Sequence, residues 1–253
     1  MLRAYYRLIK PGIVYENVFT VLSGYLFGVR FDVSWVSLVA TALGMGSVIA
    51  GSCVFNNILD RDIDARMERT KDRATVTGVL SLRIIALYGA MLILFGLALL
   101  YVLTNALTVM VAIVGIFFYV IVYGYAKRRV RTHTLIGSIA GAAPILAGYT
   151  AATGVIGIPG TILFLILVLW QMPHFYAIAL YRGDDYRAAG VPLLPDVAGI
   201  FKTKVVIVVY IVAFVFAQMS LTVLGYTGYS YLAVVLGFGI AWLVRALRGF
   251  HAH

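Results

Sequence analysis

The chain has 253 residues, of which 62% are hydrophobic and only 12% are charged. Soluble domains carry about 25% charged residues, so this composition excludes a water-exposed globular protein. The net charge of +10 does not indicate nucleic-acid binding, because the basic residues lie in short loops between apolar segments. The single cysteine excludes an internal disulfide. We expect one all-α domain over residues 1–253, built as a bundle of transmembrane helices.

Eight apolar stretches are long enough to cross a membrane, since a spanning helix needs about 20 mostly apolar residues. In chain order they cover residues 13–29, 35–59, 80–103, 106–126, 134–152, 161–181, 204–224 and 230–247. None of them alternates in polarity at every second residue, as the strands of a membrane β-barrel do. The sequence therefore predicts a polytopic helix bundle with eight spans.

The loops between these spans alternate sharply in charge. The two termini and the loops at 60–83, 127–131 and 182–204 hold 19 of the 20 Lys and Arg residues, and Arg30 alone lies on the other side. Cytoplasmic loops carry an excess of Lys and Arg. We therefore expect both termini to be cytoplasmic, in a multi-pass protein of the cell (inner) membrane whose active site faces the cytoplasm.

A cluster of carboxylates and amides follows the second span. If the helix continues, Asn56, Asp60 and Asp64 are spaced i, i+4, i+8 and share one face, with Asn57 beside them. Like charges at this spacing repel, so a bound cation would stabilise the arrangement. Carboxylate and amide oxygens suit Mg²⁺, which binds one or two carboxylates together with substrate phosphates. These four residues are candidate metal ligands.

A second acidic pair, Asp184 and Asp185, follows the sixth span and is also predicted to bind metal. Two such loops facing each other could hold Mg²⁺ ions with a diphosphate between them. Nearby basic residues could bind the phosphate oxygens, among them Arg66 and Arg69, and we expect this above all of five residues: Arg61, Lys71, Arg73, Arg182 and Arg187. Metal and base together would stabilise a departing diphosphate.

Three of these carboxylates, Asp60, Asp64 and Asp185, are the candidate catalytic residues. The alternative for any of the acidic residues is an ordinary solvated loop with salt bridges. We favour that alternative for the remaining three carboxylates of the first loop, which are Asp62, Glu68 and Asp72.

His174 lies inside the sixth span, next to Pro173, which removes a backbone donor and bends a helix. An ionisable residue at this depth is a candidate functional group by default. The alternative is a neutral histidine that is hydrogen-bonded to a neighbouring helix.

These residues match a known family. Residues 56–73 resemble the NDxxDxxxD motif of the UbiA superfamily of intramembrane prenyltransferases, with Asn57 where many members have Asp. The resemblance is greatest to the haem O synthase branch, through the same stretch, the segment WQMPHF at 170–175 and the segment VPLLP at 191–195. Members of the family have nine helices, whereas this sequence predicts eight spans.

The resemblance implies a reaction. Farnesyl diphosphate and haem B would be the substrates, Mg²⁺ the cofactor and haem O the product. The 2-vinyl group of haem B would attack the farnesyl cation, and water would then quench the resulting cation. From its position beside Pro173 and near the second acidic loop, we predict that His174 contacts this haem, as an axial ligand to iron or through a hydrogen bond to a propionate. The resemblance also implies that the protein associates with haem A synthase or with the assembly of a terminal oxidase.

Three other classes fit parts of the pattern. A UbiA-type prenyltransferase acting on a quinone precursor or chlorin shares the acidic motif, and only the segment at 170–175 argues against it. A membrane transporter would place ionisable residues near the bilayer midplane and break helices in both halves, whereas these carboxylates gather at one interface. A CDP-alcohol phosphotransferase requires a DGxxAR…GxxxDxxxD pattern, which this sequence lacks.

Overall fold

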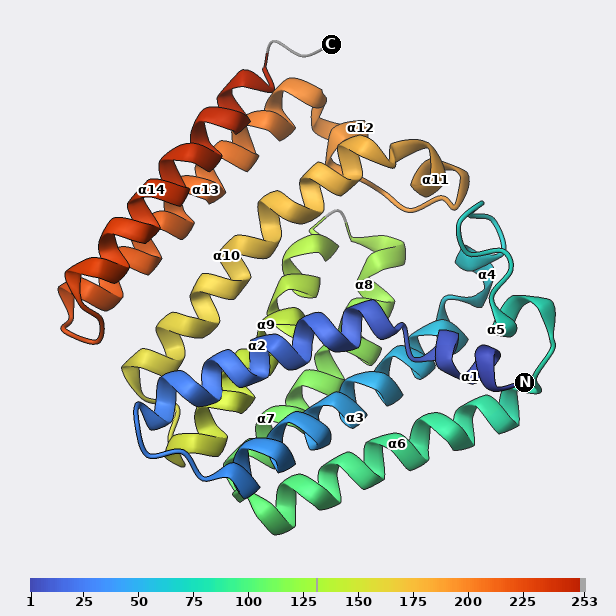
Figure 1. Ribbon diagram of the computed structural model, residues 1–253. Helices are drawn as coiled ribbons and strands as arrows, with labels where there is room; N and C mark the ends of the chain where they lie inside the picture. The colour runs from blue at the N-terminus through green and yellow to red at the C-terminus, as the bar shows by residue number, and fades with distance from the viewer. Residues whose placement is uncertain (131, 251–253) are drawn as a thin grey trace.

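The computed structural model describes residues 1–130 and 132–250, which form a bundle of helices (Figure 1). Within these residues, eight helical segments are long and apolar enough to cross a membrane. They are α2 (Pro11–Val29), α3 (Trp35–Leu59), α6 (Leu82–Leu103), the continuous segment Ala106–Arg129, α9 (His133–Thr153), α10 (Gly157–Tyr181), α13 (Ile200–Val223) and α14 (Tyr229–Arg248). Each coincides with one predicted stretch, so the predicted fold class is confirmed.

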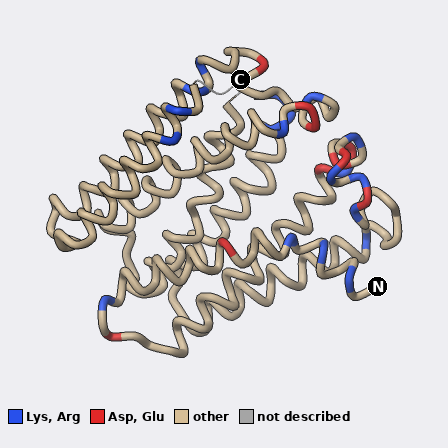
Figure 2. The backbone as a smooth tube through the Cα atoms, turned by 45° about the horizontal axis from the view of Figure 1, so that its top comes forward, with Lys and Arg blue, Asp and Glu red and all other residues tan. Residues whose placement is uncertain are grey.

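Short helices gather at one end of the bundle (Figure 1). They are α1 (Leu2–Leu8), α4 (Arg61–Asp64), α5 (Ala74–Thr77), α11 (Gly183–Ala188) and α12 (Leu194–Ala198). Most of the Lys, Arg, Asp and Glu residues lie at this same end, which we call the charged end (Figure 2). This clustering agrees with the charge pattern of the loops, whereas the side of the membrane that the charged end faces stays a prediction.

Side-chain caps start three of the long helices, two of them on the side opposite the charged end. Ser34 caps α3, and Asn105 caps the segment that begins at Ala106, where its side-chain oxygen accepts from the Thr108 backbone N–H at 2.9 Å. At the charged end, Ser81 caps α6 in the same way. Such caps satisfy backbone donors that have no partner inside the helix. Polar residues between the apolar runs therefore help to determine where these three helices begin.

The segment Ala106–Arg129 contains a π-helical turn. It consists of α7 (Ala106–Ile116), η1 (Phe117–Val122) and α8 (Tyr123–Arg129). A π-turn inserts an extra residue into the helix and changes which side chains share a face. Here Tyr119 and Tyr123 stack with their ring centroids 6.2 Å apart, and both line the central cavity.

Glycines allow the long helices to approach closely. A Cβ atom on Gly148 of α9 would lie 1.9 Å from the carbonyl oxygen of Val21, and one on Gly24 of α2 would lie 2.1 Å from that of Ile145. Lipid tails are as apolar as leucine, so helices in a membrane associate through such close packing rather than through burial from water. The pair α3 and α6 packs in the same way through Gly44, Gly51, Gly89 and Gly96.

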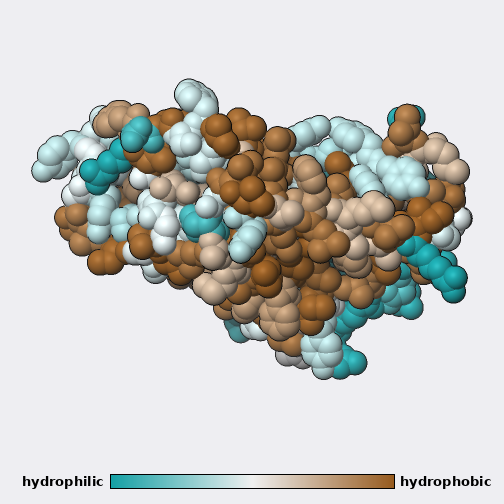
Figure 3. All heavy atoms as spheres, turned by 90° about the horizontal axis from the view of Figure 1, so that it is seen from below, coloured by the Kyte–Doolittle hydropathy of each residue, from teal (hydrophilic) through white to brown (hydrophobic). Residues whose placement is uncertain are grey.

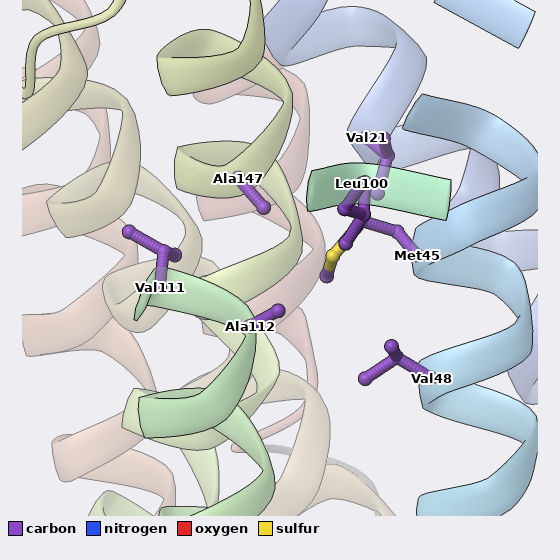
Figure 4. Close-up of a cluster of buried hydrophobic side chains, with 7 residues drawn as sticks. All are labelled: Val21, Met45, Val48, Leu100, Val111, Ala112 and Ala147. Carbon is purple, nitrogen blue, oxygen red and sulfur yellow. The ribbon is translucent and has the colours of Figure 1, made fainter. Parts of the chain in front are cut away.

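The helix α9 is central, since it packs against α2, α7 and α10, while α6 flanks α3, and α13 and α14 extend the bundle beyond α10. A buried apolar cluster joins α2, α3, α6, α7 and α9 (Figure 4). It contains Val21, Met45, Val48, Leu100, Val111, Ala112 and Ala147. The outer face seen in Figure 3 is largely apolar, as a lipid-facing surface must be.

Candidate active site

A cavity of about 900 Å³ lies inside the bundle and extends from the charged end toward the membrane interior. Side chains from α2, α3, α9, α10 and α13 and from the segment 106–129 line it. Met45, Val48 and Ala112 belong both to its wall and to the apolar cluster of Figure 4, so this cluster closes the cavity on one side. The cavity therefore joins a polar end to an apolar interior.

Asn56, Asp60 and Asp64 all line the polar end of this cavity. The helix α3 ends at Leu59, yet backbone hydrogen bonds of the i to i−4 type continue across the junction with α4: the Asp60 N–H donates to the Asn56 carbonyl at 2.9 Å, and the Asp64 N–H to the Asp60 carbonyl at 2.7 Å. The predicted common face is thereby preserved. Asn57 is buried away from the cavity wall, where its side chain donates to the Leu8 carbonyl at 2.8 Å and ties α1 to α3.

Each side chain of this trio is bonded to a cation. Lys127 Nζ donates to Asp60 Oδ2 at 2.9 Å, and Arg73 Nη1 donates to Asp64 Oδ2 at 2.6 Å. Lys10 Nζ donates to the amide oxygen of Asn56 at 2.5 Å. Both carboxylates are almost fully buried, so these partners offset the cost of removing two charges from water.

The oxygen atoms at this end fit a magnesium ion. Asp60 Oδ1 is buried and has no hydrogen-bond partner among the described residues, and the guanidinium of Arg128 lies 3.9 Å from it. Asp64 and Asn56 add further hard oxygen donors, which Mg²⁺ prefers. Nowhere in the described ranges do three or more His, Cys, Asp or Glu side chains form a group that could hold a metal alone. Mg²⁺ is commonly bound by one or two carboxylates together with water and substrate phosphates.

Lys10 contributes an unusual charge to the site. It lies between α1 and α2, and burial lowers the pKa of its ammonium group from 10.5 to about 8, while Asp60 and Asp64 partly oppose this shift. Lys10 is therefore charged near neutral pH but loses its proton within the range in which enzymes are commonly assayed.

The second acidic pair lies outside the cavity wall. Asp184 is exposed on α11 and accepts a hydrogen bond from Arg187, whose guanidinium also donates to Asp196 at 2.7 Å. Asp185 is half-buried on the same helix, and among the residues of α11 that the structure describes, Tyr186 reaches the cavity. The two acidic loops nevertheless pack against each other, since Ile63 and Met67 form one buried cluster with Ala189 and Val191. A metal-binding role for Asp184 and Asp185 stays a prediction.

Among the five basic residues predicted to bind a diphosphate, Arg73 lines the cavity. The others lie outside its wall: Arg61 is exposed, Lys71 pairs with Glu68 at 2.5 Å, Arg182 lies over the ring of Tyr181, and Arg187 bonds to Asp184 and Asp196. The cavity also receives Arg69, and two basic residues that were not predicted as ligands, namely Lys10 and Lys127. The charge pattern of the loops did not distinguish them from their neighbours.

Aromatic side chains line the apolar interior. His174 and Trp170 of α10 lie parallel, with ring centroids 5.3 Å apart at an interplanar angle of 11°. Both border the cavity, and α10 remains helical through Pro173. The side chain of His174 is exposed and also contacts the ring of Phe175, with centroids 5.7 Å apart. A contact of His174 with haem stays a prediction.

Comparison with known proteins decides the family. Residues 17–253 match the UbiA prenyltransferase family. The chain belongs to this family. A protein named Protoheme IX farnesyltransferase from Yersinia pseudotuberculosis serotype O:1b (strain IP 31758) is 46% identical over 253 residues, which are all of this chain and 86% of the relative. The protein is thus a UbiA-type prenyltransferase.

Solved structures share the fold of this UbiA prenyltransferase. A digeranylgeranylglyceryl phosphate synthase structure has a TM-score of 0.81 at 20% identity, covering 99% of this chain and 88% of the other. A UbiA homolog from Archaeoglobus fulgidus bound to DMAPP and Mg²⁺ has a TM-score of 0.75 at 16% identity, covering 95% and 85%. At these identities the likeness establishes the UbiA fold.

Proposed function

We propose that this prenyltransferase moves the farnesyl group of farnesyl diphosphate onto the 2-vinyl group of haem B and forms haem O, with Mg²⁺ as its cofactor. The observation that carries the proposal is the 46% identity over the whole chain to a Protoheme IX farnesyltransferase. The cavity supports it, because its polar end suits a diphosphate with metal and its apolar interior suits a prenyl chain and a porphyrin.

At the polar end, Asp60, Asp64 and Asn56 are the residues that would hold magnesium. When bound, the metal neutralises charge on the diphosphate and improves it as a leaving group. Arg73 and Lys127 transfer their hydrogen bonds from the carboxylates to phosphate oxygens, where charge-assisted bonds are strong. The residues outside the cavity wall remain candidates for the same work: Asn57, Arg61, Lys71, Arg182, Asp184, Asp185 and Arg187.

In the apolar interior, His174 and Trp170 form a platform for the porphyrin, and His174 either ligates the iron or bonds a propionate. The bond between C1 of the farnesyl group and the diphosphate oxygen breaks, and the oxygen keeps the electron pair. The vinyl group then forms a carbon–carbon bond to C1, which leaves a cation beside the porphyrin ring. Tyr119 and Tyr123 shield positive charge with their ring faces. Water adds to the cation, and its proton passes to the released diphosphate.

The proposed function also includes the orientation of the protein, with the charged end in the cytoplasm. The excess of Lys and Arg there supports a cytoplasmic orientation in the inner membrane. Association with haem A synthase or with oxidase assembly would then place the product near its use. Reporter domains inserted after Phe31 and after Gly78 test the orientation: we expect periplasmic activity from the first insertion alone, and the reverse pattern contradicts it.

The reaction is tested with purified protein, haem B, farnesyl diphosphate and Mg²⁺, followed by mass spectrometry of the pigments. We expect haem O from the wild type and none after removal of Mg²⁺ with EDTA or with Asp60→Asn. A parallel reaction offers 4-hydroxybenzoate as a quinone precursor in place of haem B. Prenylation of that acid without any haem O would replace the proposal with its alternative.

A further inference from the structure

The amide of Gln171 is held in one orientation inside the membrane. Gln171 lies on α10 and is buried, with 6% of its surface exposed, yet it borders the cavity. Its Nε2 donates to two backbone carbonyls, at 3.2 Å to Leu167 of its own helix and at 3.4 Å to Ser138 of α9. Both partners are acceptors, so a flipped amide would place its oxygen against two other oxygens. The two acceptors of Nε2 therefore fix the position of Oε1 on the other side of the amide.

A glycine makes room for this amide. A Cβ atom on Gly141 of α9 would lie 2.1 Å from Gln171 Oε1 and 2.9 Å from the amide carbon. Only glycine at position 141 leaves that space, so α9 supplies both the acceptor for the amide nitrogen and the space for the oxygen. The hydrogen bonds of Gln171 to described residues both come from Nε2, so no described donor bonds to Oε1, and the residue borders the cavity.

An acceptor held in this way has a chemical use in the proposed reaction. Gln171 precedes His174 by three residues on α10, so the two side chains lie on neighbouring parts of one helix face. His174 is the residue to which we assign the porphyrin. An oxygen fixed beside that platform can accept a hydrogen bond from a water molecule and leave the water's lone pair free.

We propose that Gln171 positions the water that quenches the cation formed after prenyl transfer, and so selects the hydroxylated product. The inference rests on the proposed function. The water donates one hydrogen to Gln171 Oε1, its oxygen forms the new bond to the cationic carbon, and its other proton leaves for the released diphosphate. Without a positioned water, the cation instead loses a proton from the adjacent carbon and gives an alkene.

The choice of an amide suits this role. Glu16 of α2 also lines the cavity, but a carboxylate next to a carbocation can attack it and form an ester. Asn17 lines the cavity as well, and its amide nitrogen bonds within its own helix to the Ile13 carbonyl at 2.8 Å. Gln171 differs from Glu16 because its amide is neutral. It differs from Asn17 because two helices, rather than one, fix its amide.

The test is the product distribution of Gln171→Leu, which keeps the volume and removes the oxygen. Diphosphate release, hydroxylated product and alkene are measured together, with ¹⁸O-labelled water to trace the hydroxyl oxygen. We expect the ratio of hydroxylated product to alkene to fall about tenfold, equivalent to about 1.4 kcal/mol, while diphosphate release stays near the wild-type rate. Gly141→Ala, which displaces the amide without removing it, should shift the ratio in the same direction.

The outcomes separate this inference from the proposed function. If the wild type forms no hydroxylated prenyl-haem, the proposed function fails. If the wild type forms it and Gln171→Leu keeps the same ratio, the role of Gln171 is overturned. A folded Gln171→Leu protein that loses diphosphate release and product in equal measure also overturns it, because the residue would then act before the quench. If Gln171→Leu does not fold, Gln171→Asn is used, because it draws the oxygen back by one methylene. An unchanged ratio of hydroxylated product to alkene in that variant also overturns the role of Gln171.

Discussion

We expect farnesyl diphosphate binding to depend on pH through the ammonium group of Lys10. Its pKa is lowered to about 8, and only the charged form can bond a phosphate oxygen. The charged fraction is about nine-tenths at pH 7 and about one-tenth at pH 9. We therefore expect the Kd for farnesyl diphosphate to rise about tenfold between these pH values, which corresponds to about 1.4 kcal/mol.

The free energy of unfolding should rise with pH, whereas the affinity for farnesyl diphosphate should fall. Because the folded pKa lies below 10.5, the native protein binds fewer protons than the unfolded chain between pH 8 and pH 10.5. Unfolding free energy contributed by Lys10 therefore rises with pH across this window, by roughly 3 kcal/mol at most. Alkaline denaturation would instead weaken binding and stability together.

Two variants isolate the lysine. Lys10→Met should bind farnesyl diphosphate weakly at every pH, and Lys10→Arg should bind it with little change from pH 7 to 9, because arginine stays charged. Titration in detergent, without haem, measures all three proteins. A wild-type Kd that stays constant over this range, or a Lys10→Met profile as steep as that of the wild type, would refute the assignment of Lys10 to the diphosphate.

Three further changes test other parts of the site. Asp64→Asn should lower Mg²⁺-dependent turnover about a hundredfold, whereas the exposed Asp72→Asn should leave it near wild type; equal losses would contradict the metal assignment. His174→Ala should raise the Kd for haem about tenfold, with a changed Soret band if the imidazole ligates iron, and an unchanged Kd and spectrum would reduce His174 to a packing residue. Gly148→Ala should cost about 1–3 kcal/mol of stability and lower Tm, while Gly237→Ala, which meets no described atom within 4 Å, should leave Tm unchanged.

The spans were predictable because each is a long run of apolar residues. Their ends were less so: the fourth span continues to Arg129 rather than stopping at 126, since backbone hydrogen bonding does not end where the lipid does. The π-helical turn from Phe117 to Val122 leaves no mark on the hydropathy pattern, yet it places Tyr119 and Tyr123 together on the cavity wall.

The candidate site was predictable where it depends on local spacing. Asn56, Asp60 and Asp64 share a face because helical geometry requires it. Lys127 reaches Asp60 from 67 residues away, and the rule that explains an excess of basic residues in these loops treats every Lys and Arg alike. Which cations enter the cavity is decided by tertiary packing.

The pairing of carboxylates with cations at the polar end has a thermodynamic consequence. If Asp60 and Asp64 hold the metal as proposed, a metal ion arriving alone would have to displace Lys127 and Arg73 from them. A diphosphate arriving alone must draw the same cations away and strand two buried carboxylates. When both arrive, every charge finds a partner. Metal and diphosphate should therefore bind with a favourable coupling free energy, and each must raise the affinity of the other by the same factor. A site that holds the metal or the diphosphate alone is then sparsely populated. The farnesyl cation should therefore form only when both are bound.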